Sequence, residues 1–490
     1  MADVADRPGS GEIASELPSK YLPGVEYRDL PEPQGLRKYA GASVIITATA
    51  LGSGELILWP YLTTLVGLGI VWLSVLGITM QYFLNMEIER YTLITGETAV
   101  TGFSRLWIGW GMIFVLGAIL PNAFPGWATG GAKVFTFIFG LSDAVSPIIT
   151  IIFLISIGLA ITLSPVVYQT LEKVQAVAIA GVLVFIVVAI VIATDGSAWA
   201  GVVTEAPGGA ASLPGYLSTI GAASFLGAIA FAGAGGANNL VQSNYVRDKG
   251  MGMGIHIPNI VSPITGEEEA APGLGYVPPS TEDNERRWKQ WWKIANQEQL
   301  ITFWAIGVLL LVSLSVLVFS TIGVRPNIGT DLVFIQEEAT ALGNTIAPWF
   351  ETFFLIAGFL MLFSTNLGVV DYTSRLTGDT LKVTFLRDST FWSESKIYVT
   401  VVWILIIFGG LIVLAQLEPV VLLVLSATGG GVVMAFYSVL LILLNRRALP
   451  EFAKLKGWRL PVMVLIALFF VSFALVLAYQ MVTQGPGSFV

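Results

Sequence analysis

Several residue types that build common active sites are scarce in this chain of 490 residues. It has no cysteine, which excludes disulfides, thiolate metal sites and cysteine nucleophiles. The single histidine, His256, leaves little room for imidazole chemistry, so we expect neither an enzyme nor a bound cofactor. Charged residues make up only 12% of the chain, against about 25% in soluble domains. The net charge is −8 and the basic residues are dispersed, which gives no reason to expect a nucleic-acid partner.

Long apolar runs are what the chain has in excess. Hydrophobic residues form 55% of it, and the mean hydropathy is +0.77. Apolar runs of about 18 or more residues recur along the whole chain, which predicts an all-α protein spanning a lipid membrane many times. The eleven predicted spans are residues 40–65, 68–87, 107–139, 146–164, 173–194, 217–246, 298–321, 347–371, 397–416, 419–445 and 460–483.

The basic residues predict the orientation of these spans. Apart from Lys133 and Arg325, the 25 lysines and arginines lie in the N-terminal tail or in every second loop. Basic loops stay in the cytoplasm, so we expect a plasma-membrane protein with a cytoplasmic N-terminus. An odd number of spans then makes the C-terminus extracellular. The oligomeric state stays open.

The middle of the first span combines a helix-weakening sequence with a charge. Gly52, Ser53 and Gly54 are followed directly by Glu55. Glycines weaken a helix, and a carboxylate at the centre of a span costs about 2.5–3.5 kcal/mol. Together they predict an unwound segment that forms a substrate or ion site. The alternative is that the glycines allow close helix packing and that Glu55 caps a half-helix.

The sixth span repeats this pattern. Its centre contains Gly233, Gly235 and Gly236, followed by Ala237, Asn238 and Asn239. The two interruptions lie five spans apart and so occupy matching positions in two halves of five spans each. Because five is odd, the second half begins on the opposite side of the membrane and is inverted relative to the first. Paired glycine-interrupted segments of this kind indicate the central site of a transporter.

We therefore divide the chain into four parts. Residues 1–39 are a polar cytoplasmic tail without an apolar core, and 40–194 form the first five-helix repeat. Residues 217–445 form the second repeat, with a cytoplasmic insertion at 248–297 whose last helix, around Arg286–Lys293, we expect on the membrane surface. Residues 446–490 hold the eleventh helix and a short extracellular C-terminus.

The expected ligands at the two interruptions are hard oxygen donors. The side chains of Glu55, Asn238 and Asn239, with unwound backbone carbonyls, suit Mg²⁺, Mn²⁺, Na⁺ or a protonated amine. The tentative metal ligands are Glu55 and Asn238. Glu87 and Glu89, at the end of a span, are interpreted as solvated or vestibule groups.

Other polar residues inside spans are candidates for the pathway or for coupling, each with a structural alternative. Lys133 can snorkel to the interface, and Asp371 can pair with Arg375 one turn away. The remaining polar residues can bond between helices. The candidates are Lys133, Ser243, Ser364, Thr365, Asn366, Asp371, Ser426 and Thr428.

Three stretches resemble the Nramp family of divalent-metal transporters. They are Gly41–Gly96 in the first two spans, Leu226–Ser243 in the sixth and Phe363–Gly378 in the eighth. The resemblance covers about residues 37–447. It implies the LeuT-type fold of two inverted five-helix repeats, with unwound helices 1 and 6, one extra helix, and the substrate between spans 1 and 6.

The chain departs from that family at the metal-binding motifs. Where the family has Asp-Pro-Gly-Asn, this chain has Gly52-Ser-Gly-Glu55, so the metal-binding aspartate is missing. Where the family has Met-Pro-His, this chain has Gly236-Ala-Asn238. A second family histidine falls at Ser243, and a family glutamine falls near Thr428.

Three functions remain open at this point. The first is a carrier of a hard divalent cation, Mg²⁺ or Mn²⁺, working by alternating access with altered selectivity. The second is a symporter of amino acids or other organic solutes, because Gly52-Ser-Gly54 looks like the carboxylate-binding break of amino-acid carriers. The third is a receptor or scaffold that keeps the fold without transport.

Overall fold

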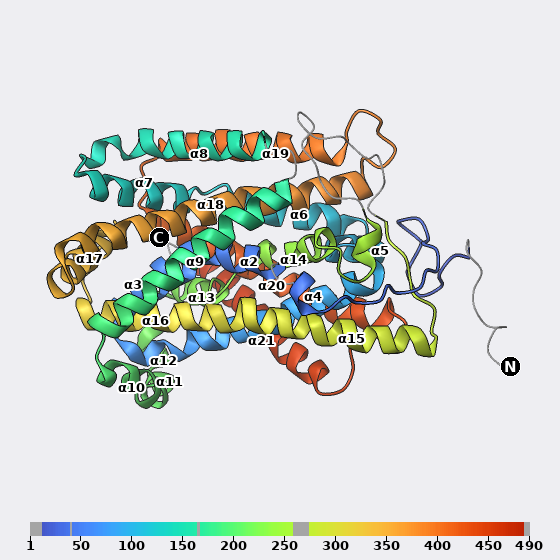
Figure 1. Cartoon of the computed structure of the whole chain (residues 1–490), viewed down its shortest axis with the longest axis horizontal. Helices are drawn as coiled ribbons and strands as arrows, with labels where there is room; N and C mark the ends of the chain where they lie inside the picture. Colours follow the sequence, from blue (N-terminus) through green and yellow to red (C-terminus); the bar gives the residue numbers. More distant parts are fainter. Residues whose placement is uncertain (1–11, 40–41, 164–166, 258–273, 485–490) are drawn as a thin grey trace.

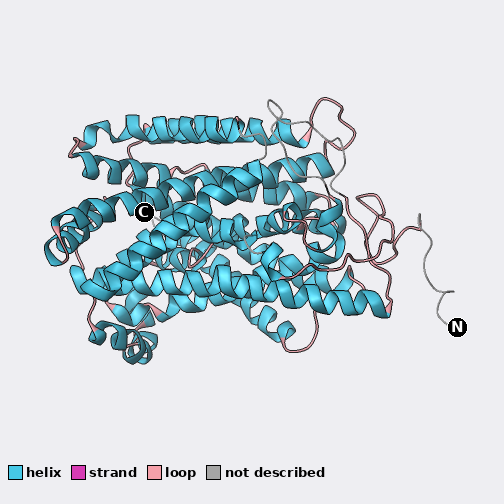
Figure 2. Cartoon of the chain, in the orientation of Figure 1, coloured by secondary structure: helices cyan, strands magenta, loops and turns pink. Residues whose placement is uncertain are grey.

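The computed structural model describes residues 12–39, 42–163, 167–257 and 274–484, and almost all of its regular structure is helical (Figure 2). The β-type pairing in the described residues consists of two isolated bridges, Ile13 with Glu26 and Tyr27 with Val277. The helices run mostly along the longest axis of the molecule (Figure 1). We call the end where residues 12–35 lie the tail end, and the end that carries α17 (Val333–Thr345) the far end.

The first half of the chain begins with a short helix and a span built of three consecutive helical pieces. These are α1 (Leu36–Tyr39), then α2 (Ala42–Ala50), a π-helical stretch η1 (Leu51–Leu58) and α3 (Trp59–Val66). The following helices are α4 (Trp72–Thr95), α5 (Ala99–Leu106), α6 (Gly109–Asn122), α7 (Gly126–Phe139), α8 (Ser146–Thr162) and α9 (Val167–Ala193).

The second half contains the longest helices. Short helices α10 (Gly196–Thr204), α11 (Ala206–Ala211) and α12 (Leu213–Ile220) lead into α13 (Ala222–Ala230) and α14 (Gly236–Asp248). After these come α15 (Glu282–Glu298), a second π-helical stretch η5 (Gln299–Ala305), α16 (Ile306–Thr321), α17, α18 (Pro348–Thr384), α19 (Glu394–Val413), α20 (Pro419–Arg447) and α21 (Arg459–Gln484).

Length and composition make this a membrane protein. Eight helices of the described chain, some joined from two labelled pieces, are apolar and long enough to cross a membrane. Two bent helix pairs raise that number to as many as ten, one of them α12 with α13, which bends by 107°. This finding is consistent with the eleven predicted spans, the first of which is the series α2, η1 and α3.

The outward faces of the peripheral helices are apolar, as a lipid environment requires. On α8 the exposed large side chains follow helical spacing at Ile148, Ile152, Ile155 and Leu159. The neighbouring helix α19 exposes a similar row, and the two helices lie side by side along one edge (Figure 1). Polar side chains are instead buried on α4, α14 and α18. Apolar side chains therefore face lipid, while polar side chains gather inside the bundle.

The last helix of the insertion does not lie on the membrane surface, so that prediction is wrong. Residues Glu282–Thr321 form one long helical rod of 40 residues, α15, η5 and α16, which runs across the molecule (Figure 1). The tryptophans of α15 are held by protein. Trp291 Nε1 donates to Pro31 O at 2.7 Å, and the Tyr39 and Trp291 ring centroids are 4.8 Å apart. This packing replaces the headgroup contacts expected from the sequence.

The N-terminal segment is also more than a polar tail. Residues 12–35 bury Ala14, Leu17, Leu22, Val25 and Leu30, which the expectation of no apolar core had missed. Their backbone is tied to the helices because Arg105 of α5 donates to Pro18 O at 3.1 Å and to Pro23 O at 2.8 Å. Five scattered apolar residues do not form a run or pattern that predicts a core from sequence. They are buried because they pack against the tail end of the helix bundle.

Candidate functional site

The first predicted interruption is wound as a π-helix, so the prediction of an unwound helix 1 is wrong. Gly52, Ser53, Gly54 and Glu55 all lie within η1. The Trp59 N–H donates to Gly54 O, five residues earlier, which is the π-helical spacing. The wider π turn keeps the backbone around the glycines hydrogen-bonded. An unwound segment would leave N–H and C=O groups unpaired in hydrocarbon, at a higher cost in free energy. π-helical segments of this kind are frequent at functional sites.

The two glycines of η1 permit close contact with two other spans. The Gly52 N–H donates to Thr365 Oγ1 of α18 at 2.8 Å. A Cβ at Gly54 would lie 1.8 Å from Phe231 O, in the interruption of the sixth span. The close-packing role considered from the sequence is therefore present at both glycines, and it brings the first and sixth spans together at their centres.

The predicted interruption of the sixth span is confirmed. Helix α13 ends at Ala230 and α14 begins at Gly236, with non-helical backbone between them. Gly233, Gly235 and Gly236 have φ of 118°, 70° and 57°, values that favour glycine over any other residue. At Gly236 a Cβ would lie 2.8 Å from the Gly430 Cα of α20, so this glycine also allows two spans to touch.

A residue that the sequence reasoning missed holds this interruption in place. Gln81 of α4 donates through Nε2 to Ala230 O at 2.7 Å and to Ala232 O at 3.0 Å. Its Oε1 accepts from the Gly235 N–H at 2.9 Å. The side chain thus supplies the partners that a broken helix leaves unsatisfied. A glutamine inside an apolar span was the available signal.

The side-chain oxygens predicted as ligands are buried and unsatisfied. Glu55 is 0% exposed, and neither of its carboxylate oxygens has a hydrogen-bond partner among the described residues. Asn238 is 1% exposed, and its Oδ1 is likewise without a partner in the described chain. Asn239 donates through Nδ2 to Asn85 Oδ1 at 2.7 Å and leaves its own Oδ1 without one. Unsatisfied buried oxygens of this type need a ligand, a proton or water.

The other predicted residues divide between this site and other places. Thr365 belongs to the site through Gly52, and Ser364 and Asn366 are buried beside it on α18. On α20, the hydroxyls of Ser426 and Thr428 have no partner among the described residues. Ala237 is buried at the start of α14.

Ser243, Asp371 and Lys133 lie elsewhere. Ser243 Oγ donates to Leu240 O at 2.5 Å, a bond within its own helix. Lys133 Nζ lies 2.6 Å from Asp143 Oδ2 in a surface crevice of about 400 Å³ at the far end, which Glu418 also lines. Lys133 therefore reaches outward, as the snorkelling interpretation expects.

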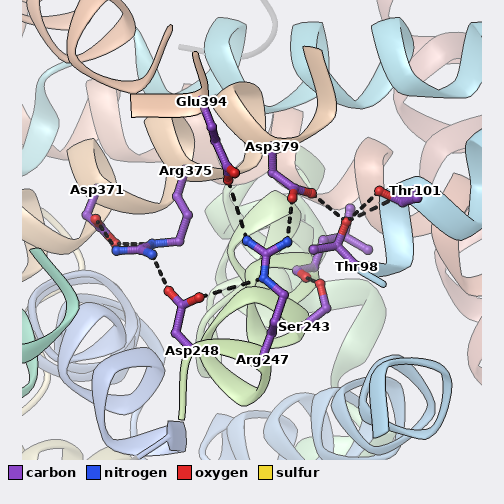
Figure 3. Close-up of polar contacts among 10 residues, drawn as sticks. Thr98, Thr101, Ser243, Arg247, Asp248, Asp371, Arg375, Asp379 and Glu394 are labelled. Carbon is purple, nitrogen blue, oxygen red and sulfur yellow. Dashed lines mark hydrogen bonds and ion pairs between the residues drawn. The ribbon is translucent and has the colours of Figure 1, made fainter. Parts of the chain in front are cut away.

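Asp371 belongs to a buried ion network at the tail end (Figure 3). The predicted pair with Arg375 is present, at 3.0 Å between Asp371 Oδ1 and Arg375 Nη2, and Arg375 also donates to Asp248. Arg247 Nη1 lies 2.5 Å from Asp379 Oδ1, and Nη2 lies 3.5 Å from Glu394 Oε1. The network joins α14, α18 and α19. Sequence reasoning assigned most of these charges to loops, because they lie beyond the apolar part of each span.

Glu87 and Glu89 are also buried, so their interpretation as solvated groups is wrong: both are 0% exposed. Helix α4 continues to Thr95, well past the predicted end of the second span, and protein surrounds its last two turns.

Among the described residues, no group of three or more His, Cys, Asp or Glu is arranged to hold a metal ion. A cation beside Glu55 would therefore rely largely on neutral oxygens.

Comparison with solved structures identifies the fold. Crystal structures of two mutants of the Eremococcus coleocola manganese transporter match with TM-scores of 0.63 and 0.64, each at 13% identity. The first match covers 94% of this chain and 90% of the other, the second 92% and 89%. Mhp1, a nucleobase-cation-symport-1 family transporter in a closed conformation, matches with a TM-score of 0.52 at 15% identity, covering 91% of this chain and 93% of its own. No family model and no curated protein sequence matches this chain.

The fold is thus the LeuT-type fold expected from the resemblance, shared over nearly the whole length of known transporters. At 13–15% identity the likeness extends to the path of the backbone and not to the ligands. What this chain binds has to be argued from its own side chains.

Proposed function

We propose that this chain is a secondary-active transporter that moves a hard divalent cation, Mg²⁺ or Mn²⁺, by alternating access. The observation that carries the proposal is the carboxylate of Glu55. It is fully buried at the point where the first and sixth spans touch, and none of the described residues bonds it. An intramembrane carboxylate without a partner is expensive, and a cation is the ligand that would compensate it.

The other donors of the proposed site are hard oxygens. Asn238 and Asn239 each have an Oδ1 without a partner among the described residues, and the non-helical backbone at 231–235 can contribute carbonyls. This donor set suits Mg²⁺ and Mn²⁺ better than softer metals, because sulfur and imidazole are missing from both motifs. With a single carboxylate, the ion would keep part of its water shell.

A second candidate cargo is an organic solute that carries an ammonium group. A single carboxylate neutralises the one positive charge of an ammonium group but only half of the charge of a divalent ion. This favours an amine over a bare divalent ion. Mhp1, which shares the fold, binds an organic molecule, bromovinylhydantoin, so an organic cargo is compatible with the fold. The third candidate, a receptor or scaffold, would bind without transporting.

The proposal includes an arrangement in the membrane. We infer two inverted five-helix repeats at residues 40–194 and 217–445, and a cytoplasmic position for the tail end. The support for this position is the distribution of lysines and arginines, most of which fall outside the predicted spans on that side.

The test is uptake into liposomes that contain the purified full-length protein. Mg²⁺ or Mn²⁺ should accumulate, and Glu55→Gln should abolish uptake and also the thermal stabilisation by the cation, about 2.7 kcal/mol at 100 times Kd. The matched control is Glu338→Gln, which removes another fully buried carboxylate, on α17 away from the site. Stabilisation by amino acids alone would favour the second cargo. Equal cation binding by wild type and Glu55→Gln would refute the proposed site.

A further inference from the structure

A row of polar side chains extends from the interruption of the sixth span toward the tail end. Gln81, Asn85 and Glu89 of α4 are spaced by four residues, so they lie on one face of the helix. Gln81 holds the interruption at Gly235, and Asn85 accepts from Asn239, one turn further along α14. The row ends at Glu89, two turns from Gln81.

Glu89 is buried where four spans converge. Its Oε1 accepts from Gln242 Nε2 of α14 at 2.6 Å and from Gln299 Nε2 of η5 at 2.7 Å. Gln242 also donates to Ser43 Oγ of α2 at 3.0 Å. The other oxygen, Glu89 Oε2, has no partner among the described residues. One carboxylate oxygen is therefore fully satisfied, and the other is buried without a donor.

A charged group that acts on Glu89 has the same sign. It is the carboxylate of Glu298, which repels a charge on Glu89. Glu298 already has its own compensation: it accepts from the Ser43 N–H at 3.0 Å and from the Ser43 hydroxyl. These groups lie at the start of α2, where the helix dipole favours a negative charge.

The cations of this region serve a different carboxylate. Arg90 donates to Glu87 at 2.6 and 3.0 Å, and Arg459 Nη1 lies 3.6 Å from Glu87 Oε1. Glu87 and Glu89 are two residues apart and so project from opposite faces of α4. The remaining titratable neighbour is Tyr82, whose hydroxyl donates to Asn296 Oδ1 at 3.1 Å.

We propose that Glu89 is a proton-binding site that couples proton movement to the cargo, a role that rests on the proposed transport function. An ionised Glu89 would be a buried charge beside a like charge, at a cost of several kcal/mol. Binding one proton removes both penalties. The carbonyl oxygen of the neutral acid then accepts the two amide N–H groups, and the proton resides on Oε2.

Release of the proton follows from the position of Glu89 between moving parts. Its hydrogen bonds come from α14 and η5, and Gln242 of α14 is bonded in turn to Ser43 of α2. Any separation of these helices at the tail end would admit water to the carboxyl group. Water solvates the carboxylate, the proton leaves as a hydrated ion, and Glu89 becomes charged. The row Gln81, Asn85 and Glu89 connects this step to the interruption that Gln81 holds.

The first test detects the proton directly and needs no cargo. At neutral pH, the infrared difference spectrum of wild type minus Glu89→Gln, both full-length and in lipid, should contain a carboxylic-acid C=O band, because the contributions of other neutral carboxyl groups such as Glu338 cancel. The matched control is Glu87→Gln on the same helix, which should leave the band unchanged because Glu87 is ion-paired. Glu89→Asp should shift the band, which separates loss of the proton from loss of folding. Equal carboxylic-acid absorbance in wild type and Glu89→Gln would overturn the proposal.

The second test concerns coupling, with Mn²⁺ as the probe. Mn²⁺ uptake into liposomes should acidify the lumen for wild type and for Glu87→Gln, and Glu89→Gln should lose that acidification for each ion taken up. Undiminished acidification in Glu89→Gln would overturn the coupling role. A wild type that takes up no Mn²⁺ would refute Mn²⁺ as the cargo, whereas the infrared band would still report whether Glu89 holds a proton.

Discussion

The contact between the first and sixth spans can be tested with a single methyl group, by Gly54→Ala. The added Cβ would lie 1.8 Å from Phe231 O, whereas ordinary contacts begin at 3.4 Å. The carbonyl, or the whole π-helical stretch, must therefore move by about 1.6 Å. The obstacle is backbone in a packed interior and not a flexible side chain, so it can yield only if two spans shift.

The expected cost follows from this displacement. Overpacking of a well-packed interior usually costs about 1–3 kcal/mol, and a collision with backbone belongs at or above the upper end. Alanine is otherwise better than glycine in a helix by about 1 kcal/mol, which offsets part of the loss. We expect a net destabilisation of about 2 kcal/mol and a melting temperature lower by several degrees.

The assay is thermal unfolding of the purified protein with and without Mn²⁺, followed by tryptophan fluorescence. Gly410→Ala in α19 is the matched control, because a Cβ there meets nothing within 4 Å. The control should melt at or slightly above the wild-type temperature. If Gly54→Ala melts like the control and binds Mn²⁺ like wild type, then the two spans do not meet at Gly54 as described, and the proposed site loses its main support.

Three further variants test other parts of the structure. Burial raises the pKa of Glu338 on α17 from 4.5 to about 8, so the folded state binds more protons between these values and stability falls as pH rises through them. Glu338→Gln should remove this loss, at most about 1.4 kcal/mol per pH unit, from melting curves, whereas Glu337→Gln at the partly exposed neighbouring position should keep it. Gln81→Ala leaves groups of the sixth-span interruption unpaired and should lower the melting temperature by the equivalent of about 1–3 kcal/mol. Arg375→Ala leaves Asp371 buried without its cation and removes one of the two cations beside Asp248, and it should cost about 3–5 kcal/mol, measured as lost melting temperature or lost folded yield.

Much of the fold was predictable because lipid imposes a simple rule on sequence. Apolar runs located the spans, and the glycines at 233–236 located the interruption of the sixth span. Contacts between spans were less predictable. The glycines at 52 and 54 predicted a gap in the first helix, yet the backbone there forms π-helical hydrogen bonds. Sequence patterns do not distinguish a π-helical segment from an unwound one.

The polar groups at the tail end were missed for a different physical reason. Hydropathy measures the cost of contact with lipid, and it ends a predicted span where that cost becomes too high. Helices α4 and α18 continue beyond those limits because their last turns pack against protein and pair their charges. Glu89 and Asp379 therefore looked like loop residues, although both are buried. The spacing of four from Gln81 to Glu89 was the signal that could have corrected this.

The two central segments are not equivalent, and this difference constrains how the proposed site would work. The first span keeps continuous helical bonding through η1, so its contribution to a cation is the side chain of Glu55. The sixth span leaves Phe231–Gly235 non-helical and holds it through Gln81, so its carbonyls can turn with the interruption. Charge thus comes from a continuous helical segment and neutral oxygens from a non-helical one. Because Gln81 begins the row that ends at Glu89, a change in the interruption would act on Gln81 first, and proton loss at Glu89 would follow along the same helix face.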